Sequence, residues 1–82
     1  MTKINKLIQR FRNKPRDFSY NELQRMLNHF GYKQLEAGGS RVIFINRANG
    51  HKMKLHKPHP GNILKRYQID YVKTELEIKR LL

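Results

Sequence analysis

Apolar residues recur along this chain at two different periods, one typical of helices and one typical of strands. Over residues 2–13, and again over about Tyr20–Phe30, they return every three or four positions, which predicts two helices with one buried face each. A proline between the two segments disfavours helix in the residue before it and separates them. Ser19 and Glu22 have the spacing of a capping box at the start of the second helix. Gly31 lies where a left-handed residue would end that helix.

The middle of the chain changes to an alternation with a period of two, which is typical of strands. We predict three strands, over Tyr32–Glu36, Ser40–Asn46 and His51–His56. The Gly-rich residues 37–39 and an Asn-Gly pair within residues 47–50 favour tight turns between neighbouring strands. The third strand alternates apolar residues with lysine and histidine, so one side of it should face the core and the other should be cationic.

The pattern becomes helical again from about Tyr67. The inner face of this last helix is expected to carry Ile69, Val72, Leu76, Ile78 and Leu82. The predicted order is therefore helix, helix, three antiparallel strands, helix. Helices on one face of a small antiparallel sheet form a two-layer α+β domain, and a length of 82 residues fits one compact domain.

The formal charge of +12 is distributed unevenly along the chain. Residues 1–16 contain six lysines and arginines and no acid, and residues 41–66 contain seven and no acid. Such blocks of positive charge attract polyanions, chiefly nucleic acid. Solvated lysines on an ordinary soluble domain are the plain alternative, but charge of one sign in two blocks costs self-repulsion. An anionic membrane surface is a weaker candidate, because the first helix is short and lacks tryptophan.

The sequence has no cysteine, which excludes disulfides, thiolate zinc sites and a thiol nucleophile. It has no apolar run long enough to span a bilayer and no signal-peptide core at its start, so we expect a cytoplasmic protein with no membrane partner. His56 and His59 have the spacing of a metal-binding pair. Neither cysteine nor a nearby carboxylate accompanies them, so no metal and no small-molecule cofactor is expected.

Histidine and arginine near the third strand give the chain its candidate chemistry. RNA carries its own nucleophile, the 2′-hydroxyl, so a ribonuclease without metal needs a base, an acid and cations for the phosphate. If the second and third strands pair across residues 46–50, Arg41 lies beside His56, with His59 close by. We hypothesise that His56 or His59 serves as base or acid, because histidine titrates near neutral pH, and that Arg41 with Lys57 holds the phosphate. The predicted RNA contacts are Ser40, Arg41, Lys52, Lys54, Lys57, Lys65 and Arg66.

Several of these residues also have an ordinary structural interpretation. The two histidines could bond to the backbone of their loop or pack against Pro58 and Pro60. Tyr67 and Tyr71 could stack on a base, although tyrosines at helical spacing more often pack in a core. His51 follows a glycine and is expected to be a turn residue. These alternatives stay open on the sequence.

From about Tyr20 to Leu76 the chain resembles the HicA toxin family of bacterial toxin–antitoxin systems. Four features in a fixed order carry the resemblance. They are the helix end Asn28-His29-Phe30-Gly31-Tyr32, the strand opening Gly39-Ser40 with Phe44, the loop His56-Lys57-Pro58-His59-Pro60-Gly61-Asn62, and Leu64 before the last helix. Residues 1–17 lie outside the usual short domain and are interpreted as an added amphipathic helix, with residues 18–82 as the HicA-like domain.

The resemblance implies a double-stranded-RNA-binding-like fold and the activity of an mRNA interferase, a small ribonuclease that blocks translation. It also implies a cognate HicB antitoxin that binds and neutralises the toxin. The family motif usually reads Gly-Ser-His, with that histidine as the proposed catalytic residue, whereas this chain has Arg41. Arginine stays protonated and cannot act as a base, but it can bind the scissile phosphate or stabilise its developing charge. Two other functions therefore stay open, namely an RNA-binding module without catalysis and a basic protein-interaction domain.

Overall fold

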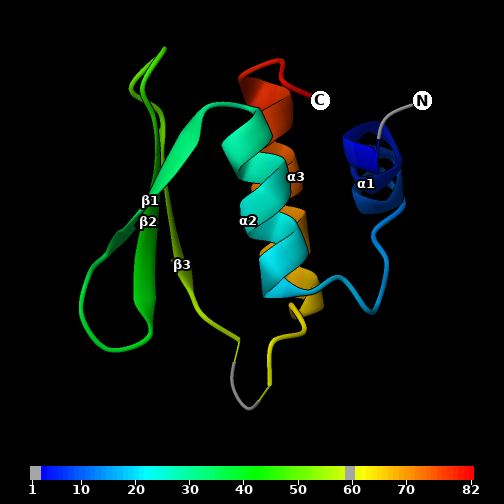
Figure 1. The fold of residues 1–82 in the computed structure, drawn as a ribbon, viewed down its shortest axis with the longest axis horizontal. Coiled ribbons are helices and arrows are strands. Elements are labelled where there is room, and N and C mark those ends of the chain that lie inside the picture. The colour runs from blue at the N-terminus through cyan, green and yellow to red at the C-terminus, as the bar shows by residue number, and fades with distance from the viewer. Residues whose placement is uncertain (1–2, 59–60) are drawn as a thin grey trace.

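Three helices and a three-stranded antiparallel sheet form the protein, whose computed structural model describes residues 3–58 and 61–82 (Figure 1). In chain order the elements are α1 (Lys3–Arg12), α2 (Tyr20–His29), β1 (Tyr32–Glu36), β2 (Arg41–Asn46), β3 (Lys52–His56) and α3 (Arg66–Ile78). This order confirms the α+β fold predicted from the sequence. None of the described helices is long and apolar enough to cross a membrane.

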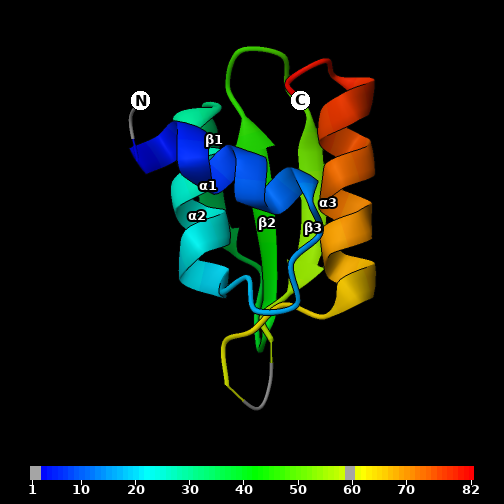
Figure 2. The same ribbon diagram turned by 90° about the vertical axis from the view of Figure 1, so that its right-hand side faces the viewer.

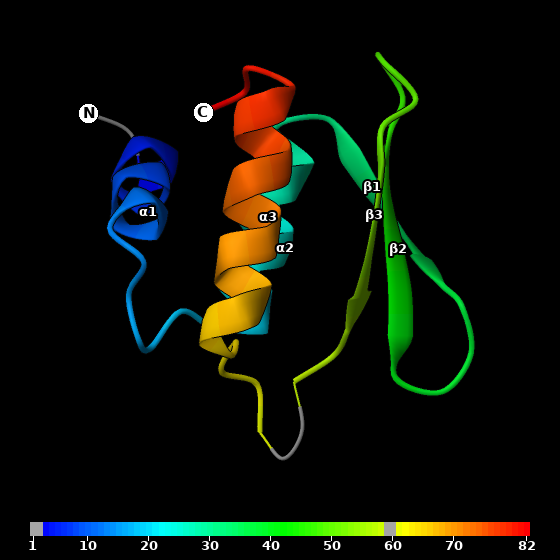
Figure 3. The ribbon, with the colours of Figure 1, turned by 180° about the vertical axis from the view of Figure 1, so that it is seen from behind.

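The helices lie on one side of the sheet. α2 and α3 lie side by side against it, and α1 lies on their outer side and crosses them (Figures 1 and 2). Figure 3 shows the arrangement from behind, with none of the described helices on the opposite face of the sheet. One end of the molecule gathers the loop between β1 and β2, the end of β3 and the starts of α2 and α3. Loops that are far apart in the sequence therefore meet at this end.

One hydrophobic core joins the sheet to the helices. Its buried members on α2, α3, the sheet and the connections include Phe18, Leu23, Met26, Leu27, Val42, Phe44, Met53, Leu55, Leu64, Ile69, Val72 and Leu76. α1 adds Leu7 and Phe11 to the same cluster. The Phe11 ring packs against the Phe18 ring, with 5.1 Å between their centroids. The N-terminal helix thus buries its apolar face in the core that the rest of the chain uses.

Most of the predicted inner face of α3 is confirmed. Ile69, Val72 and Leu76 are buried, and Leu82 is half-buried against the core. The prediction for Ile78 is wrong, because 64% of its surface is exposed. A helix turns about 100° per residue, so a side chain two positions after Leu76 points to nearly the opposite side.

The ends of α2 have the geometry that the sequence predicts. The Glu22 N–H donates to Ser19 Oγ at 3.1 Å, and the Ser19 N–H donates to a carboxylate oxygen of Glu22 at 3.0 Å, which completes the capping box. Gly31 follows the helix with a φ of 95°, in the region that favours glycine. Because this glycine reverses the chain direction, β1 begins at the very next residue.

Candidate nucleic-acid interface

The face of the sheet that points away from the helices carries a row of cations on β3. The register of β2 and β3 pairs Arg41 with His56, Ile43 with Lys54 and Ile45 with Lys52. β1 continues two of these rows on the other side of β2, with Leu35 opposite Ile43 and Lys33 opposite Ile45. Because side chains alternate between faces, these residues share the face opposite the buried residues of β2. We call this surface the open face; its residues are Lys33, Leu35, Arg41, Ile43, Ile45, Lys52, Lys54 and His56.

Arg41, Lys54 and His56 line a common hollow of about 290 Å³ on the open face. We call it the Arg41 hollow; its other lining residues are Ala37, Val42, Ile43 and Leu55. The predicted placement of Arg41, Lys54 and His56 in one neighbourhood is therefore confirmed, and all three residues are exposed. His59 lies outside the described residues, so its place beside them stays a prediction.

Contacts on two sides fix the position of His56 at the end of β3. Its ring Nδ1 lies 3.4 Å from Ser40 Oγ, and its backbone carbonyl accepts a 2.8 Å hydrogen bond from Gln68 Nε2. Gln68 is buried, and its side-chain oxygen also accepts a 2.9 Å hydrogen bond from the Lys65 N–H. One amide side chain thus ties the end of β3 to the start of α3. The sequence gives no local signal for this role of Gln68, because its partner on β3 is twelve residues away.

Lys57 lines a hollow of about 520 Å³ with Gly39, Ser40 and Pro58, separate from the Arg41 hollow, and its side chain is paired with an acid. Its ammonium lies 2.8 and 3.1 Å from the two carboxylate oxygens of Glu36. Its backbone N–H donates to the Ser40 carbonyl at 2.7 Å, which joins the residue after β3 to the residue before β2. Exposed ion pairs of this kind contribute about 0–1 kcal/mol, so a phosphate can replace Glu36 without a large cost. The phosphate-binding role of Lys57 stays a prediction.

The remaining predicted RNA contacts are spread over two surfaces. Lys52 lies on the open face at the start of β3. Lys65 and Arg66 lie at the start of α3, at the end of the molecule where β3 ends. Arg66 lines a separate hollow of about 270 Å³ together with Lys14 and Arg16. The structure therefore groups Arg66 with cations of the α1–α2 connection and not with the Arg41 hollow.

His51 does more than the turn residue that we predicted. Its Nδ1 lies 2.6 Å from the Tyr32 hydroxyl and its Nε2 lies 3.1 Å from Glu75 Oε1, and only 10% of its side chain is exposed. Burial raises the pKa of Tyr32 above its ordinary value, so this hydroxyl keeps the proton that it can donate to the ring. The two partners are 19 and 24 residues away in the sequence, so no local pattern could show this bridge from the residue before β3 to β1 and α3.

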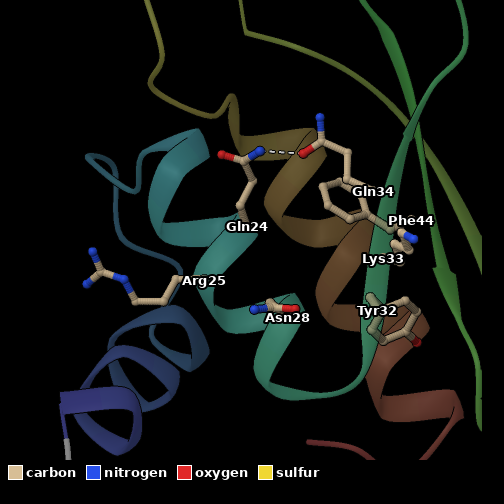
Figure 4. Close-up of a pocket in the computed structure, with 7 residues that line it drawn as sticks. All are labelled: Gln24, Arg25, Asn28, Tyr32, Lys33, Gln34 and Phe44. Carbon is tan, nitrogen blue, oxygen red and sulfur yellow. Dashed lines mark hydrogen bonds between the residues drawn. The ribbon is translucent and has the colours of Figure 1, made fainter.

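A further hollow, of about 420 Å³, lies between α2 and β1 (Figure 4). Its lining residues are Gln24, Arg25, Asn28, Tyr32, Lys33, Gln34 and Phe44, and Gln24 and Gln34 hydrogen bond to each other. None of the predicted site residues that the structure describes lines this hollow. Within residues 3–58 and 61–82, no group of three or more His, Cys, Asp or Glu side chains gathers in a way that could hold a metal ion.

Comparison with known protein families gives a match that agrees with the resemblance seen in the sequence. The family model described as HicA toxin of bacterial toxin–antitoxin systems matches residues 20–78, from the first residue of α2 to the last residue of α3. The match covers well over half of the chain, includes the Arg41 hollow and leaves out α1. Comparison with curated proteins and with solved structures gave no match. The chain belongs to the HicA toxin family.

Proposed function

We propose that this protein is the toxin of a type II toxin–antitoxin system and that it cleaves mRNA, which stops translation and growth. The observation that supports cleavage best is the pairing of Arg41 with His56 on the open face. It brings a permanent cation and a titratable imidazole together in a surface hollow. Membership of the HicA family supports the toxin class.

The proposed reaction breaks the bond between phosphorus and the 5′-oxygen of the following nucleotide. A base takes the proton of the 2′-hydroxyl as its oxygen attacks phosphorus, and an acid gives a proton to the departing 5′-oxygen. His56 performs one of these two proton transfers, and His59 is the candidate for the other. Arg41 binds the phosphate oxygens and stabilises the negative charge that develops on them. Ser40, which lies beside His56, is a candidate for a further phosphate contact.

The position of His56 suggests how the protein manages without the histidine of the family motif. Position 41, where related toxins usually have histidine, is arginine in this chain. His56 is its direct cross-strand neighbour, and such neighbours have Cβ atoms about 4.5–5.5 Å apart. An imidazole therefore lies one strand away from its usual place, on the same face of the sheet. We infer that the imidazole function belongs to His56 here and that Arg41 has taken a phosphate-binding role.

The positive charge of the chain supports attraction of RNA over a wider surface. Lys52 and Lys54 on the open face, with Lys65 and Arg66 at the start of α3, are the proposed phosphate contacts beyond the hollow. Each phosphate contact releases counterions, so RNA affinity should fall steeply as salt rises. A HicB-like antitoxin is the proposed protein partner, and a toxin whose substrate is mRNA would act in the cytoplasm.

Expression in bacteria, with and without the adjacent reading frame, tests this function. We expect the toxin alone to stop growth and fragment cellular RNA, and co-expression of a small neighbouring protein to restore both. Purified protein should also cut RNA in the presence of EDTA, because the proposed mechanism uses no metal. Normal growth with intact RNA, despite accumulation of folded protein, would rule out the toxin activity.

Arg41 also favours a second function, an RNA-binding module that does not cleave. Arginine cannot act as a base, so a site that depends on position 41 for proton transfer would bind RNA and leave it whole. This alternative predicts retention of intact RNA at low salt and no fragments after long incubation. A protein-interaction domain, the third possibility, predicts weak RNA affinity and tight capture of a specific partner protein.

A further inference from the structure

Two aromatic side chains on α3 stay outside the hydrophobic core. Tyr67 is 64% exposed and Tyr71 is 38% exposed. They are four residues apart, so they lie on the same side of the helix. The buried side of α3 consists of other residues, Gln68, Ile69, Val72 and Leu76. Core packing therefore does not explain Tyr67, and two neighbouring tyrosine rings are available at the surface.

These tyrosines line a hollow of about 240 Å³ between α3 and β3, which we call the tyrosine hollow. Its lining residues are Lys54, Leu55, His56, Tyr67, Gln68 and Tyr71. Lys54 and His56 also line the Arg41 hollow. His56 thus borders both hollows, with Arg41 in the first and the two tyrosine rings in the second.

Hydrogen bonds hold the two walls of the tyrosine hollow in place. Gln68 bonds to the backbone of both His56 and Lys65, which fixes the end of β3 against the first turn of α3. The Tyr71 hydroxyl accepts a weak hydrogen bond, at 3.4 Å, from the Lys54 N–H. The walls come from regular elements rather than from a loop, so the hollow is formed before a ligand arrives.

The chemistry of the tyrosine hollow fits a flat aromatic group that is attached to a phosphate. Aromatic side chains bind unpaired nucleobases by stacking, and bases inside a duplex have both faces covered already. In RNA each base hangs from the sugar next to a phosphate. A phosphate held by Arg41 would therefore place a neighbouring base on the other side of His56, where the tyrosines lie.

We propose that Tyr67 and Tyr71 bind the unpaired nucleobase next to the phosphate that Arg41 and His56 engage, so the substrate is single-stranded at this point. This proposal rests on the proposed function, because it uses the same RNA and the same His56. Tyr67, the more exposed ring, supplies the stacking face, and Tyr71 supplies a wall that the Lys54 N–H holds in position.

The test measures binding of two oligonucleotides that cannot be cleaved. The first is a short single-stranded RNA with every 2′-hydroxyl methylated, and the second is its abasic counterpart with the same sugars and phosphates. Their dissociation constants are measured by fluorescence anisotropy at one fixed salt concentration. The proteins are the wild type, Tyr67→Ala, Tyr67→Leu, Tyr67→Phe and Ile78→Ala. Ile78 is the matched control, because it is equally exposed on the same helix but lies outside the hollow.

Loss of one stacked base should weaken binding of the base-bearing RNA by about five- to 150-fold in Tyr67→Ala. Tyr67→Leu should weaken binding of this RNA by the same factor, because leucine is apolar but has no aromatic face. Tyr67→Phe and Ile78→Ala should bind it like the wild type. The abasic oligonucleotide should bind equally to all five proteins. Unchanged binding by Tyr67→Ala, or an equal loss with the abasic oligonucleotide, would overturn the proposal.

Cleavage of unmodified RNA by the wild type, measured in parallel, separates this proposal from the proposed function. Cleavage together with unchanged binding by Tyr67→Ala overturns the base site and leaves the ribonuclease. Base-dependent binding through Tyr67 without cleavage overturns the ribonuclease and leaves the base site. Failure of the wild type to bind either oligonucleotide overturns the base site, and it overturns the ribonuclease as well if unmodified RNA also stays intact.

Discussion

Replacing Phe11 by alanine should lower the free energy of unfolding by about 3–5 kcal/mol. Phe11 lies on α1, outside the region that matches the HicA family, yet its side chain is completely buried. Its ring is tilted by 58° against the Phe18 ring at 5.1 Å. Such aromatic pairs contribute about 0.5–1.5 kcal/mol beyond the area that they bury, so we expect a value in the upper part of the range.

This loss is large for a domain of this size. Small domains have a total stability of about 5–15 kcal/mol, so one substitution would remove a third or more of it in many cases. Each kcal/mol lowers the melting temperature of a small domain by about 4–8 °C, which predicts a decrease of at least about 12 °C. If the N-terminal helix were only an addition beside a self-sufficient domain, the same substitution would change little.

Urea unfolding followed by far-ultraviolet circular dichroism measures this effect. The urea concentration at the unfolding midpoint should be lower for Phe11→Ala than for the wild type. The dependence of the unfolding free energy on urea concentration should change little, because the surface exposed on unfolding is nearly the same. Gln9→Ala, at an exposed position of the same helix, should stay within about 0.5 kcal/mol of the wild type. A Phe11→Ala midpoint equal to that of the wild type would refute the conclusion that α1 is part of the core.

Three further predictions follow from buried polar groups. Gln68→Glu loses the donor to the His56 carbonyl and should lower the free energy of unfolding in urea by about 1–3 kcal/mol. Part of this stability should return at acidic pH, where a protonated carboxyl can donate, and a loss that does not depend on pH would contradict this. Burial raises the pKa of Tyr20 from 10.0 to about 12, so this hydroxyl loses its proton at lower pH in the unfolded chain than in the folded protein. The free energy of unfolding should therefore fall by about 2–3 kcal/mol as pH rises from 10 to 12. Tyr20→Phe should lack this alkaline loss and should be at least as stable at neutral pH, since no described residue hydrogen bonds to the buried hydroxyl; an identical pH profile would count against the assignment. His51→Ala removes the bridge between Tyr32 and Glu75 and should cost about 1–3 kcal/mol in the same assay, while RNA cleavage by the folded variant stays normal.

The order of elements could be predicted because each depends on signals within a few residues. The capping box of Ser19 and Glu22 and the turn at Gly31 define α2 without help from the rest of the chain. The pairing of Arg41 with His56 could also be predicted, since a short hairpin turn sets the register of the two strands that it joins. A candidate site made of neighbouring strands is therefore visible in the sequence.

Features that depend on contacts between distant segments could not be predicted in this way. The bridge through His51 and the bond from Gln68 to His56 use partners on other elements, and a polar residue does not reveal in its local sequence whether it will be buried. The pairing of Lys57 with Glu36 has the same origin, because these residues meet only once the sheet has formed. The tyrosine hollow likewise exists only because α3 lies beside β3, and the periodicity of the apolar residues does not predict which helix lies beside which strand.

The most direct test of the central claim is the cleavage rate of His56→Ala. The rate is measured with purified protein in excess over RNA and with EDTA present, so that product release does not limit it. We predict a rate at least about 100-fold below that of the wild type. RNA affinity and the circular dichroism spectrum should be unchanged, and His29→Ala, at an exposed position at the end of α2, should cleave normally. Cleavage by His56→Ala at the wild-type rate would contradict the claim that the imidazole opposite Arg41 carries out the chemistry.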